Sequence, residues 1–585
     1  MKSSPKKIKA NLEYLRKLFI MPDSPDKFIE FGHELLEMIH DFFQERGGIH
    51  SAITLPELSK IFNQTHIPDE PKLIKDVLAE IKTKVIDHSV KVGSPYYIGH
   101  MISAIPYFMI LLEMIIAALN QNQVKIETAK ASSFVEREFI AWLHRLVFNR
   151  TDRFYEKQMQ NPRVALGNIT SDGTLANLTA LMVAREKAFP PDKNFPGARV
   201  TGMERALKYY GFERAVILVS TRGHYSIKKA AGLLGLGEEN VIETPVDDFN
   251  RMDIKKLKRR INALQERSKE GKVKILAIIG IAGTTETGNI DPLSELAMIA
   301  REVDAHYHVD ACWGGSALLV DEYRPMLRGI DQADSVSIDA HKLLYCPMAM
   351  GIVLFRNEKD LNLIKQTSRY IIRRNSVDTG RFTIEGSRPF SCLKPWAALK
   401  IIGREGYGLL FRRARESTFN MIDILEEANS FELLNTPELF ILTYRFVPAH
   451  VKDQLHEWQR LARHSGAFLR YPSDISQGGI GPNEVSTSQQ EARHLLHKLR
   501  KINHLINAMN IKLHKALRLD DTTFVSRTTL EATRYRPQKI VVLRAVLINP
   551  LTDVQALKEI VETQKRLGYK IWKEFEPTYI KIAED

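Results

Sequence analysis

Cysteine is scarce in this chain. Only three of the 585 residues are cysteines, Cys312, Cys346 and Cys392, and they are widely scattered. A secreted fold held together by disulfides needs a denser set, so the sequence excludes that class. The length is sufficient to bury a large apolar core without such cross-links. We therefore expect a protein of a reducing compartment and place it in the cytoplasm.

Long uninterrupted apolar segments are absent as well. Residues 1–21 mix lysines with apolar residues and contain no continuous apolar stretch, which argues against a secretory signal. Residues 102–119 are nearly all apolar, but they contain Pro106 and Glu113, and a polar segment follows directly. This pattern indicates a buried helix that leads into an active-site loop, and we expect no membrane partner.

Acidic residues are outnumbered by basic ones, 70 against 83, which gives a net charge of +13. The basic run 255–260 alternates with Ile254, Leu257 and Ile261 at helical spacing, which is typical of a solvated helix face. No zinc-finger, RNP or KH pattern accompanies it, so we expect no nucleic-acid partner. The positive charge is better suited to anionic small molecules and phosphate.

What the chain does contain is a regular alternation of short apolar runs and helical stretches. This alternation is the pattern of βαβ units, and it predicts an α/β fold with a mostly parallel sheet covered on both faces. The expected strands are 215–219, 275–279, 307–309, 335–338 and 351–355, with 439–447 and 540–548 later in the chain. The expected helices include 28–44, 134–148, 175–187, 254–266, 293–303 and 409–427.

The same pattern of helices and strands predicts that the chain is divided into three parts. Residues 1–110 form a helical N-terminal segment, and residues 111–400 form a large domain around the parallel sheet. Residues 401–585 form a smaller α+β domain. Within this last part, residues 463–493 are rich in Gly, Ser, Pro and Gln and are predicted to be a surface insertion.

Two polar residues at the ends of expected strands indicate the chemistry. Asp310 follows the strand 307–309, and Lys342 ends the run Asp339-Ala340-His341-Lys342 after the strand 335–338. A lysine can form a Schiff base with the aldehyde of pyridoxal 5′-phosphate (PLP), and a carboxylate can keep the pyridine nitrogen of PLP protonated. Lys342 and Asp310 are therefore predicted to be catalytic residues of a PLP site, with His341 near the phosphate or the lysine.

Small residues at a helix start offer a seat for the phosphate of this cofactor. Gly173 and Thr174 precede the helix 175–187, where unpaired backbone N–H groups and the helix dipole favour an anion. Gly283 and Thr284 follow the strand 275–279 and are expected to line the same cleft. An ordinary helix cap and an ordinary turn are the alternatives for these two pairs.

Three histidines lie near these expected strand ends. His224 follows the strand 215–219, at the edge where open α/β sheets bind ligands, and its imidazole is expected to stack on the pyridine ring and relay a proton. His306 and His308 are alternate residues of one strand. No clustered Cys, Asp or Glu accompanies them, so we interpret both as structural and expect no metal site.

Together these segments resemble the group II PLP-dependent amino-acid decarboxylases, of fold type I, over about residues 90–450. The segments that carry the resemblance are GNITSDGTLANLTAL from Gly167, RGHYSIKKAAGLLGLG from Arg222, GIAGTTETGNIDPL from Gly280 and ADSVSIDAHKLLYCPM from Ala333. In detail they look most like the bacterial members that decarboxylate aspartate. The resemblance implies a PLP fold type I large domain with PLP as the cofactor.

The resemblance also implies a homodimer whose subunits share the active site. Gly386 and Ser387 are expected to reach the cofactor phosphate of the partner subunit, and Ala311 is expected to contact the cofactor within its own subunit. Tyr370, in an expected mobile loop at 366–384, is the predicted catalytic residue that protonates Cα.

Substrate contacts are expected from Gln121, Gln123 and Arg388, because an acidic substrate needs cationic or amide partners. Asp172 stands where many members of the family have a small residue. A carboxylate aimed at phosphate would be repelled, so we expect Asp172 to turn away or to cap the helix.

The expected reaction is the α-decarboxylation of an acidic L-amino acid, with L-aspartate converted to β-alanine and CO2. In bacteria this reaction supplies pantothenate and coenzyme A synthesis. A glutamate decarboxylase that makes GABA is the main alternative, because one methylene changes binding by only about 1–3 kcal/mol. A carbon–carbon lyase of the sphingosine-phosphate lyase type and a non-enzymatic basic binding protein are further alternatives.

Overall fold

The chain forms two compact units. One comprises residues 1–93 with 519–522, and the other comprises residues 94–518 with 523–585. The predicted boundaries after residues 110 and 400 remain predictions. The computed structural model describes residues 13, 15–22, 25–45, 48–51, 53–266, 272–368, 372–373, 376–464 and 487–584.

The first unit is helical, with α2 (Phe28–Gln44), α3 (Leu55–Ile61) and α4 (Ile74–Lys84). The bounds of α2 agree with the amphipathic helix predicted there. Helix α3 begins at a capping box, in which Glu57 N donates to Thr54 Oγ1 and Thr54 N donates to Glu57 Oε2. Ile49 N donates to Asp521 O at 2.7 Å, which ties the short segment 519–522 to this unit.

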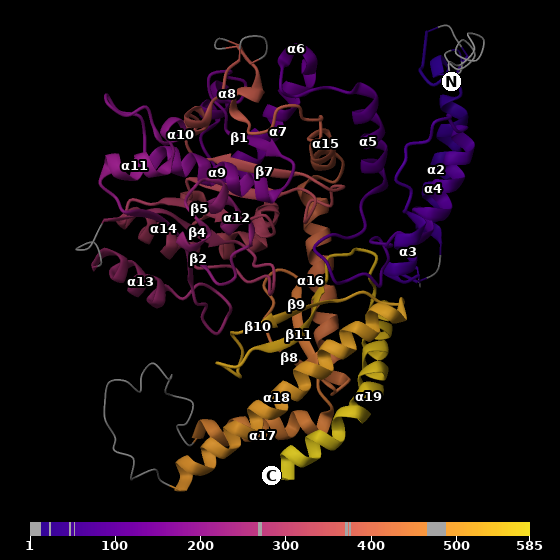
Figure 1. Cartoon of the computed structure of the whole chain (residues 1–585), viewed down its shortest axis with the longest axis vertical. Helices are drawn as coiled ribbons and strands as arrows, with labels where there is room; N and C mark the ends of the chain where they lie inside the picture. Colours follow the sequence, from indigo (N-terminus) through magenta and orange to yellow (C-terminus); the bar gives the residue numbers. More distant parts are fainter. Residues whose placement is uncertain are drawn as a thin grey trace. The chain divides into compact units, whose positions relative to one another are not determined.

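The second unit is built on a seven-stranded sheet with the order β1-β7-β6-β5-β4-β2-β3 (Figure 1). Only β7 is antiparallel to its neighbours, so the prediction of a mostly parallel α/β sheet is confirmed. The strands are β1 (Gly167–Thr170), β2 (Arg214–Ser220), β3 (Val241–Thr244), β4 (Val273–Ile281), β5 (His306–Asp310), β6 (Ser335–Asp339) and β7 (Gly351–Phe355).

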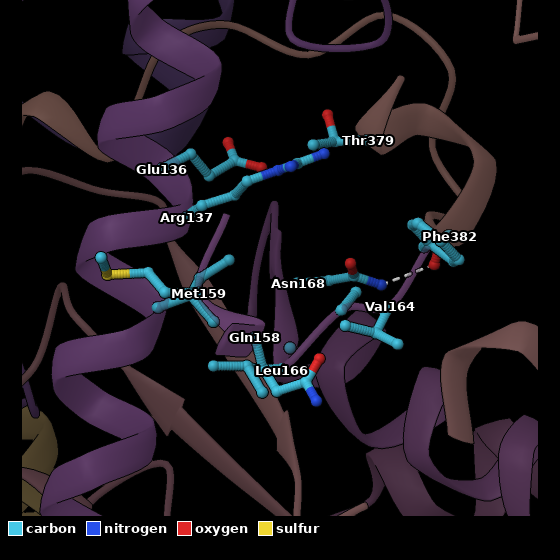
Figure 2. Close-up of a pocket in the computed structure, with 12 residues that line it drawn as sticks. Glu136, Arg137, Gln158, Met159, Val164, Leu166, Asn168, Thr379 and Phe382 are labelled. Carbon is cyan, nitrogen blue, oxygen red and sulfur yellow. Dashed lines mark hydrogen bonds between the residues drawn. The ribbon is translucent and has the colours of Figure 1, made fainter. Parts of the chain in front are cut away.

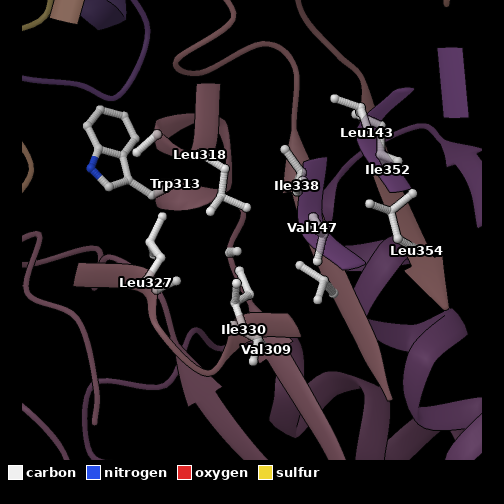
Figure 3. Packing of buried hydrophobic residues seen from close by; sticks show 14 of the residues in the cluster. Leu143, Val147, Val309, Trp313, Leu318, Leu327, Ile330, Ile338, Ile352 and Leu354 are labelled. Carbon is white, nitrogen blue, oxygen red and sulfur yellow. The ribbon is translucent and has the colours of Figure 1, made fainter. Parts of the chain in front are cut away.

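Helices cover both faces of this sheet. Successive side chains of a strand point to opposite faces, so alternate residues of one strand pack against helices on different sides. In β2, Ile217 and Val219 pack in one apolar cluster with residues of α9 and α12, whereas Val216 and Leu218 belong to another cluster with residues of α7, α13 and α14. Figure 3 shows the second cluster, where Val309, Ile338 and Ile352 of neighbouring strands lie near Leu143 and Val147 of α7.

The helices of the second unit connect and flank its strands. Before and around the large sheet they are α5 (Tyr107–Leu119), α6 (Ile126–Ala129), α7 (Ala131–Phe148), α8 (Asp152–Gln158), α9 (Gly173–Ala188), α10 (Ala198–Thr201), α11 (Met203–Tyr210), α12 (Ser226–Leu233), α13 (Ile254–Glu266) and α14 (Leu293–Glu302). Later in the chain they are α15 (Leu393–Ile401), α16 (Gly403–Glu427), α17 (Ala449–His464), α18 (Thr487–Asp520) and α19 (Val554–Glu584).

A second, antiparallel sheet lies in the C-terminal part, with the order β10-β11-β9-β8. Its strands are β8 (Phe431–Leu433), β9 (Ile441–Phe446), β10 (Ser526–Leu530) and β11 (Ile540–Val546). Strands β9 and β11 agree with the two apolar strands predicted there, and this sheet with its helices is the α+β element that the sequence predicts. Most of the predicted insertion, residues 465–486, lies outside the described residues.

The apolar helix predicted between residues 102 and 119 is not buried within the chain. Helix α5 begins only at Tyr107, and of its side chains Met109 and Ile116 are buried, whereas Leu111, Ile115 and other large apolar residues are exposed. The sequence pattern overestimated the burial, because α5 is apolar on all sides and the chain covers only one side. Within the described residues no helix is long and apolar enough to cross a bilayer.

Candidate active site

Three neighbouring strands of the large sheet end at the same edge. Parallel strands β4, β5 and β6 bring Gly283, Asp310 and Asp339 together there, because each residue lies at or just beyond the carboxyl end of its strand. Ala282 N donates to Asp310 O at 2.9 Å and Ala311 N donates to Ser337 O at 3.0 Å, which continues the pairing past the strand ends. This is the edge where open α/β sheets bind ligands.

Lys342 lies at this edge, three residues after the end of β6. Its Nζ forms an ion pair with Asp339 Oδ2 at 3.0 Å, and Asp339 is itself buried. Burial opposes the charged form of the lysine, but the carboxylates of Asp339 and Asp310 outweigh it and raise the pKa of Lys342 above its usual value. Lys342 is therefore an ammonium whose charge is balanced by two buried acids.

Asp310 is a buried carboxylate with a full set of hydrogen bonds. Its Oδ2 accepts from Asn177 Nδ2 at 2.9 Å, and its Oδ1 accepts from Cys312 N at 3.2 Å and from Ser337 Oγ at 3.3 Å. Burial alone would raise the pKa of Asp310, but His308, Lys342 and His224 together bring it below its usual value. Asp310 therefore favours its charged form, as a partner for a protonated ring nitrogen requires.

His224 follows β2 and lies beside the start of α12. Its Nδ1 is 2.8 Å from Ser226 Oγ and accepts from Ser226 N at 3.3 Å. Burial lowers the pKa of His224, and the negative charge of Asp310 opposes this only in part. The imidazole is therefore neutral near pH 7, and because Nδ1 accepts, its proton is on Nε2.

The start of α9 forms the predicted seat for an anion. Asp172 accepts a hydrogen bond from Leu175 N at 2.9 Å, so it caps the helix as expected and satisfies one free backbone donor. Gly173 is buried, and a Cβ on it would lie 2.8 Å from Asp339 Oδ2 and 2.6 Å from Cys312 Sγ. Only glycine lets these groups approach the first turn of α9, where Thr174 is half-buried.

These residues fit PLP. The site combines a buried lysine, a charged carboxylate, a neutral imidazole and a helix start free of side chains at Gly173. Asp339 Oδ1 is buried and has no hydrogen-bond partner among the described residues, so the end of β6 holds an acceptor that is available to a donor. The same set offers nothing typical of a metal site, and the described residues contain no group of three or more potential metal ligands.

The remaining predicted cofactor residues lie at the same strand ends. Gly283 has a φ of +95°, and a Cβ there would lie 2.6 Å from Trp313 Cδ1, so this turn requires glycine. Thr284 is fully buried with its Oγ1 2.9 Å from Thr287 Oγ1. His341 is buried with Nδ1 3.0 Å from Met350 O and Nε2 3.7 Å from Asp339 Oδ2, and Ala311 is buried directly after Asp310.

The predicted substrate residues form a separate group with the predicted dimer residues. Gln123 N donates to Arg388 O at 2.9 Å, and Asn122 Nδ2 donates to Ser387 Oγ at 3.0 Å, so the segments 121–123 and 386–388 lie together. Gly386 and Ser387 are exposed. The amide of Gln123 is buried, and neither of its polar atoms has a hydrogen-bond partner in the part of the chain that the structure describes.

Arg388, the third predicted substrate residue, forms a buried ion pair with Glu136. Its Nη2 donates to Glu136 Oε1 at 2.8 Å and its Nη1 to Glu136 Oε2 at 3.2 Å, and both side chains are almost fully buried. This bidentate ion pair favours a structural role for Arg388 over the substrate contact that the sequence predicts. Tyr370, the predicted proton donor, lies outside the described residues.

The sequence reasoning missed Arg544, an arginine of β11. Arg544 Nε donates to Thr285 O at 2.8 Å, but its Nη2 is buried without a partner among the described residues. Burial lowers the pKa of Arg544 to about 10, although Glu286 opposes this shift. His100 has a pKa lowered first by burial and then by the charges of Arg544 and Lys342.

The pocket drawn in Figure 2 is distinct from this site. It is lined by residues of α7, α8, β1 and the segment near 379–382, among them Glu136, Arg137 and Asn168, and includes neither Lys342 nor Asp310. Asn168 Nδ2 donates to Phe382 O at 2.6 Å across it. Its lining lacks a nucleophile or an exposed acid–base pair, so it offers no alternative centre for the chemistry.

A comparison with known families shows to which family the chain belongs. Residues 56–447 match the model of the pyridoxal-dependent decarboxylase conserved domain. The chain belongs to this family. It is a PLP-dependent amino-acid decarboxylase, and PLP is its cofactor.

Individual relatives span most of the chain. An aspartate 1-decarboxylase of Aliivibrio fischeri is 38% identical over 96% of this chain and 95% of its own length. An L-2,4-diaminobutyrate decarboxylase of Rhizobium meliloti is 27% identical over 71% of this chain and 78% of its own length. The solved structure of Oryza sativa TDC with PLP and tryptamine has the same fold, with a TM-score of 0.73 at 18% identity over 94% of this chain and 100% of that one.

Proposed function

We propose that this enzyme removes the α-carboxylate of L-aspartate and releases β-alanine and CO2. The observation that carries the substrate assignment is the 38% identity with an aspartate 1-decarboxylase along nearly the whole of both chains. Glutamate remains the alternative acidic substrate. One relative is an L-2,4-diaminobutyrate decarboxylase, so a substrate with a basic side chain is the third possibility to be tested.

The residues at the strand ends have separate tasks in this proposal. Bound PLP supplies an electron sink for the pair left behind when the Cα–carboxylate bond breaks. Asp310 holds a proton on the pyridine nitrogen, because its carboxylate stays charged in the buried site. His224 lies against the ring, and the start of α9 at Gly173 and Thr174 binds the phosphate. Gly283, Thr284, Ala311 and His341 line the same space.

Lys342 is the residue that attaches the cofactor. Its ammonium must lose a proton before the nitrogen can attack an aldehyde, and Asp339 Oδ2, 3.0 Å away, is an acceptor within hydrogen-bond distance. Asp339 also holds this group in place, because burial opposes the charged form of Lys342 and the carboxylate of Asp339 outweighs that burial. Asp339 therefore joins Lys342 and Asp310 in the proposed catalytic set.

Arg544 is the proposed partner of a substrate carboxylate. Its Nη2 is a buried cationic donor without a partner in the described part of the chain. Leaving such a donor unpaired is costly, so a bound carboxylate stabilises it. Gln121 and the buried amide of Gln123 are proposed to contact the substrate from the second group of residues, and Tyr370 to protonate Cα.

The active enzyme is proposed to be a homodimer with shared active sites. The exposed apolar side of α5 supports this, because Leu111, Met114 and Ile115 leave a continuous face in contact with water. Gly386 and Ser387 are exposed in the single chain, as residues that reach a partner's cofactor must be. The domain boundaries and the cytoplasmic location expected from the sequence remain predictions.

A direct test compares substrates. The purified, PLP-loaded enzyme is incubated separately with L-aspartate, L-glutamate and L-2,4-diaminobutyrate, and the amine products are identified by mass. The proposal expects β-alanine and a kcat/KM for aspartate at least tenfold above that for the other two. GABA as the main product makes the enzyme a glutamate decarboxylase, and 1,3-diaminopropane makes it a diaminobutyrate decarboxylase; either outcome overturns the assignment to aspartate.

A further inference from the structure

A chain of hydrogen bonds lies behind the proposed cofactor residues and has Asn177 of α9 at its centre. Asn177 is buried, and its Nδ2 donates both to Asp310 Oδ2 at 2.9 Å and to Ser226 Oγ at 3.1 Å. Ser226 Oγ is in turn 2.8 Å from His224 Nδ1. One amide therefore connects the proposed partner of the ring nitrogen with the proposed stacking imidazole.

The direction of each bond follows from Asp310. A carboxylate can only accept, so the amide of Asn177 must turn its NH2 group toward Asp310 and its Oδ1 away from it. Asn177 Oδ1 is 3.0 Å from His308 Nε2, which must therefore carry a proton. With the proton on Nε2, the other nitrogen of a neutral His308 is an acceptor, and Ser335 Oγ lies 2.9 Å from it.

Beyond His308, the series of hydrogen bonds continues in one direction through Ser335 to His306. Ser335 Oγ donates to His308 Nδ1 and is 2.8 Å from His306 Nε2, which donates to it. His306, His308 and Ser335 are all buried, and burial lowers the pKa of His308 to about 4. Burial also lowers the pKa of His306, to about 3. Both imidazoles are therefore neutral near pH 7, as they must be if every hydrogen bond of this series runs in one direction.

We propose that Asn177 is a positioning residue that holds the Asp310 carboxylate and, through Ser226, His224 in one fixed arrangement, and that His308 sets the orientation of the Asn177 amide from behind. The inference rests on the proposed role of Asp310 beside the cofactor. It assigns a task to His308, which the sequence pattern indicated only as structural. Asn177 and His308 act through Asp310 and His224 and touch no substrate.

The test compares variants in α9 and β5. Asn177→Ala removes both donors, whereas Thr179→Val is the matched control, because Thr179 is equally buried in α9 and donates only within the helix, to Leu175 O at 2.7 Å. We expect Asn177→Ala to raise the Kd for PLP and to lower kcat by roughly 10-fold or more each, with KM changed by less than about threefold. Thr179→Val is expected to stay within about twofold of the wild type in all three.

His308 supplies the second pair of variants, which keeps the test valid if Asn177→Ala fails to fold. His308→Gln retains a donor toward Asn177 and is expected to keep most of the PLP affinity, whereas His308→Leu is expected to lose about as much as Asn177→Ala. Equal losses in His308→Gln and His308→Leu contradict the proposal, as does an Asn177→Ala enzyme that matches Thr179→Val.

A measurement on the cofactor-free protein separates this inference from the proposed function. In protein labelled with 15N-histidine, the proposal expects His308 to be neutral with its proton on Nε2, and His308→Gln identifies the signal. A proton on Nδ1 overturns the hydrogen-bond chain, whatever the enzyme catalyses. Wild-type protein that shows the expected tautomer but releases no CO2 from any amino acid instead overturns the proposed function.

Discussion

At the scale of single residues, the site depends on charges that are buried but balanced. Lys342 is a cation paired with Asp339, and Asp310 is held by hydrogen bonds and by the charge of Lys342. Isolated buried charges are too costly to keep, whereas a balanced set remains ionised and fixed in place. Removing one member should therefore affect the chemistry far more than the fold.

Lys342→Ala is the first prediction at this scale. The variant should lose the absorbance band of lysine-bound PLP and all measurable turnover, because Lys342 is the amine that the end of β6 places beside Asp339. Unfolding in urea should show a fold that is retained. Lys359→Ala, at an exposed lysine, is the control and should behave as wild type; turnover by Lys342→Ala at the wild-type rate refutes the assignment.

Asp310→Asn keeps the shape of the side chain but removes its charge. Loss of the charge should let the ring nitrogen release its proton, and we expect kcat to fall at least about 100-fold, which corresponds to about 3 kcal/mol of barrier. The pH profile of kcat and the absorbance spectrum of the bound cofactor measure this effect. A variant with unchanged kcat shows that Asp310 does not act on the ring.

Arg544→Lys tests the proposed carboxylate contact. A lysine keeps the charge but loses the forked donor geometry, so KM for L-aspartate should rise roughly 10-fold or more, as expected for a lost charge-assisted hydrogen bond of about 1.5–3 kcal/mol. The Kd for PLP should change little. If KM is unchanged and PLP affinity falls instead, Arg544 supports the cofactor and not the substrate.

Site residues next to apolar runs could be predicted from the sequence, and residues placed by distant contacts could not. Lys342, Asp310 and His224 each follow an apolar strand, and the edge of a parallel sheet gathers such residues. Arg388 is predicted as a substrate contact because an acidic substrate needs a cationic partner, but Glu136, far away in sequence, pairs with it. Arg544 had a usable signal, since a charged residue inside the apolar run of β11 is seldom there without a buried task.

At the scale of elements, the strongly apolar strands and periodic helices could be predicted, and the short ones could not. Strand β7 and helices α2 and α13 have the predicted bounds, because their patterns are long or end at clear breaks. Strands β3, β8 and β10 have only three to five residues and alternate weakly, so no pattern indicated them. The burial of α5 could not be predicted, because it depends on which other elements pack against the helix, and the spacing of apolar residues within α5 does not contain that information.

The antiparallel sheet gives a pH-dependent prediction. Burial would raise the pKa of Glu432, but Arg445, His456 and Tyr535 outweigh it and lower the pKa to about 2. Because the unfolded pKa is higher, this group stabilises the fold above about pH 4.5, and the stabilisation is lost as the pH falls toward 2. The difference corresponds to about 3 kcal/mol.

Glu432→Gln measures this contribution. In urea, the variant should unfold at a lower midpoint than wild type at pH 7, and the two midpoints should converge as the pH is lowered toward 3. Glu302 is an exposed residue of α14, so Glu302→Gln is a suitable control and should show no such convergence. Midpoints that stay equally far apart at every pH contradict the account of Glu432.

At the scale of the whole molecule, the exposed apolar side of α5 predicts a dimer. Leu111 and Ile115 are one helical turn apart and both exposed, so the double substitution Leu111→Glu with Ile115→Glu should separate the subunits and abolish activity, if the sites are shared. Light scattering measures the mass. Leu551→Glu, at another exposed leucine, is the control; a double variant that remains a fully active dimer excludes α5 from the interface.

The central claim is that this enzyme cleaves the Cα–carboxylate bond of L-aspartate, and carbon labelling tests it most directly. PLP-loaded wild-type enzyme is incubated with L-aspartate carrying 13C in the α-carboxylate, and the label is followed into CO2 and into the amine. The account predicts labelled CO2 and unlabelled β-alanine in equal amounts, and neither from Lys342→Ala. Label retained in the product, alanine in place of β-alanine, or no CO2 at all would contradict it.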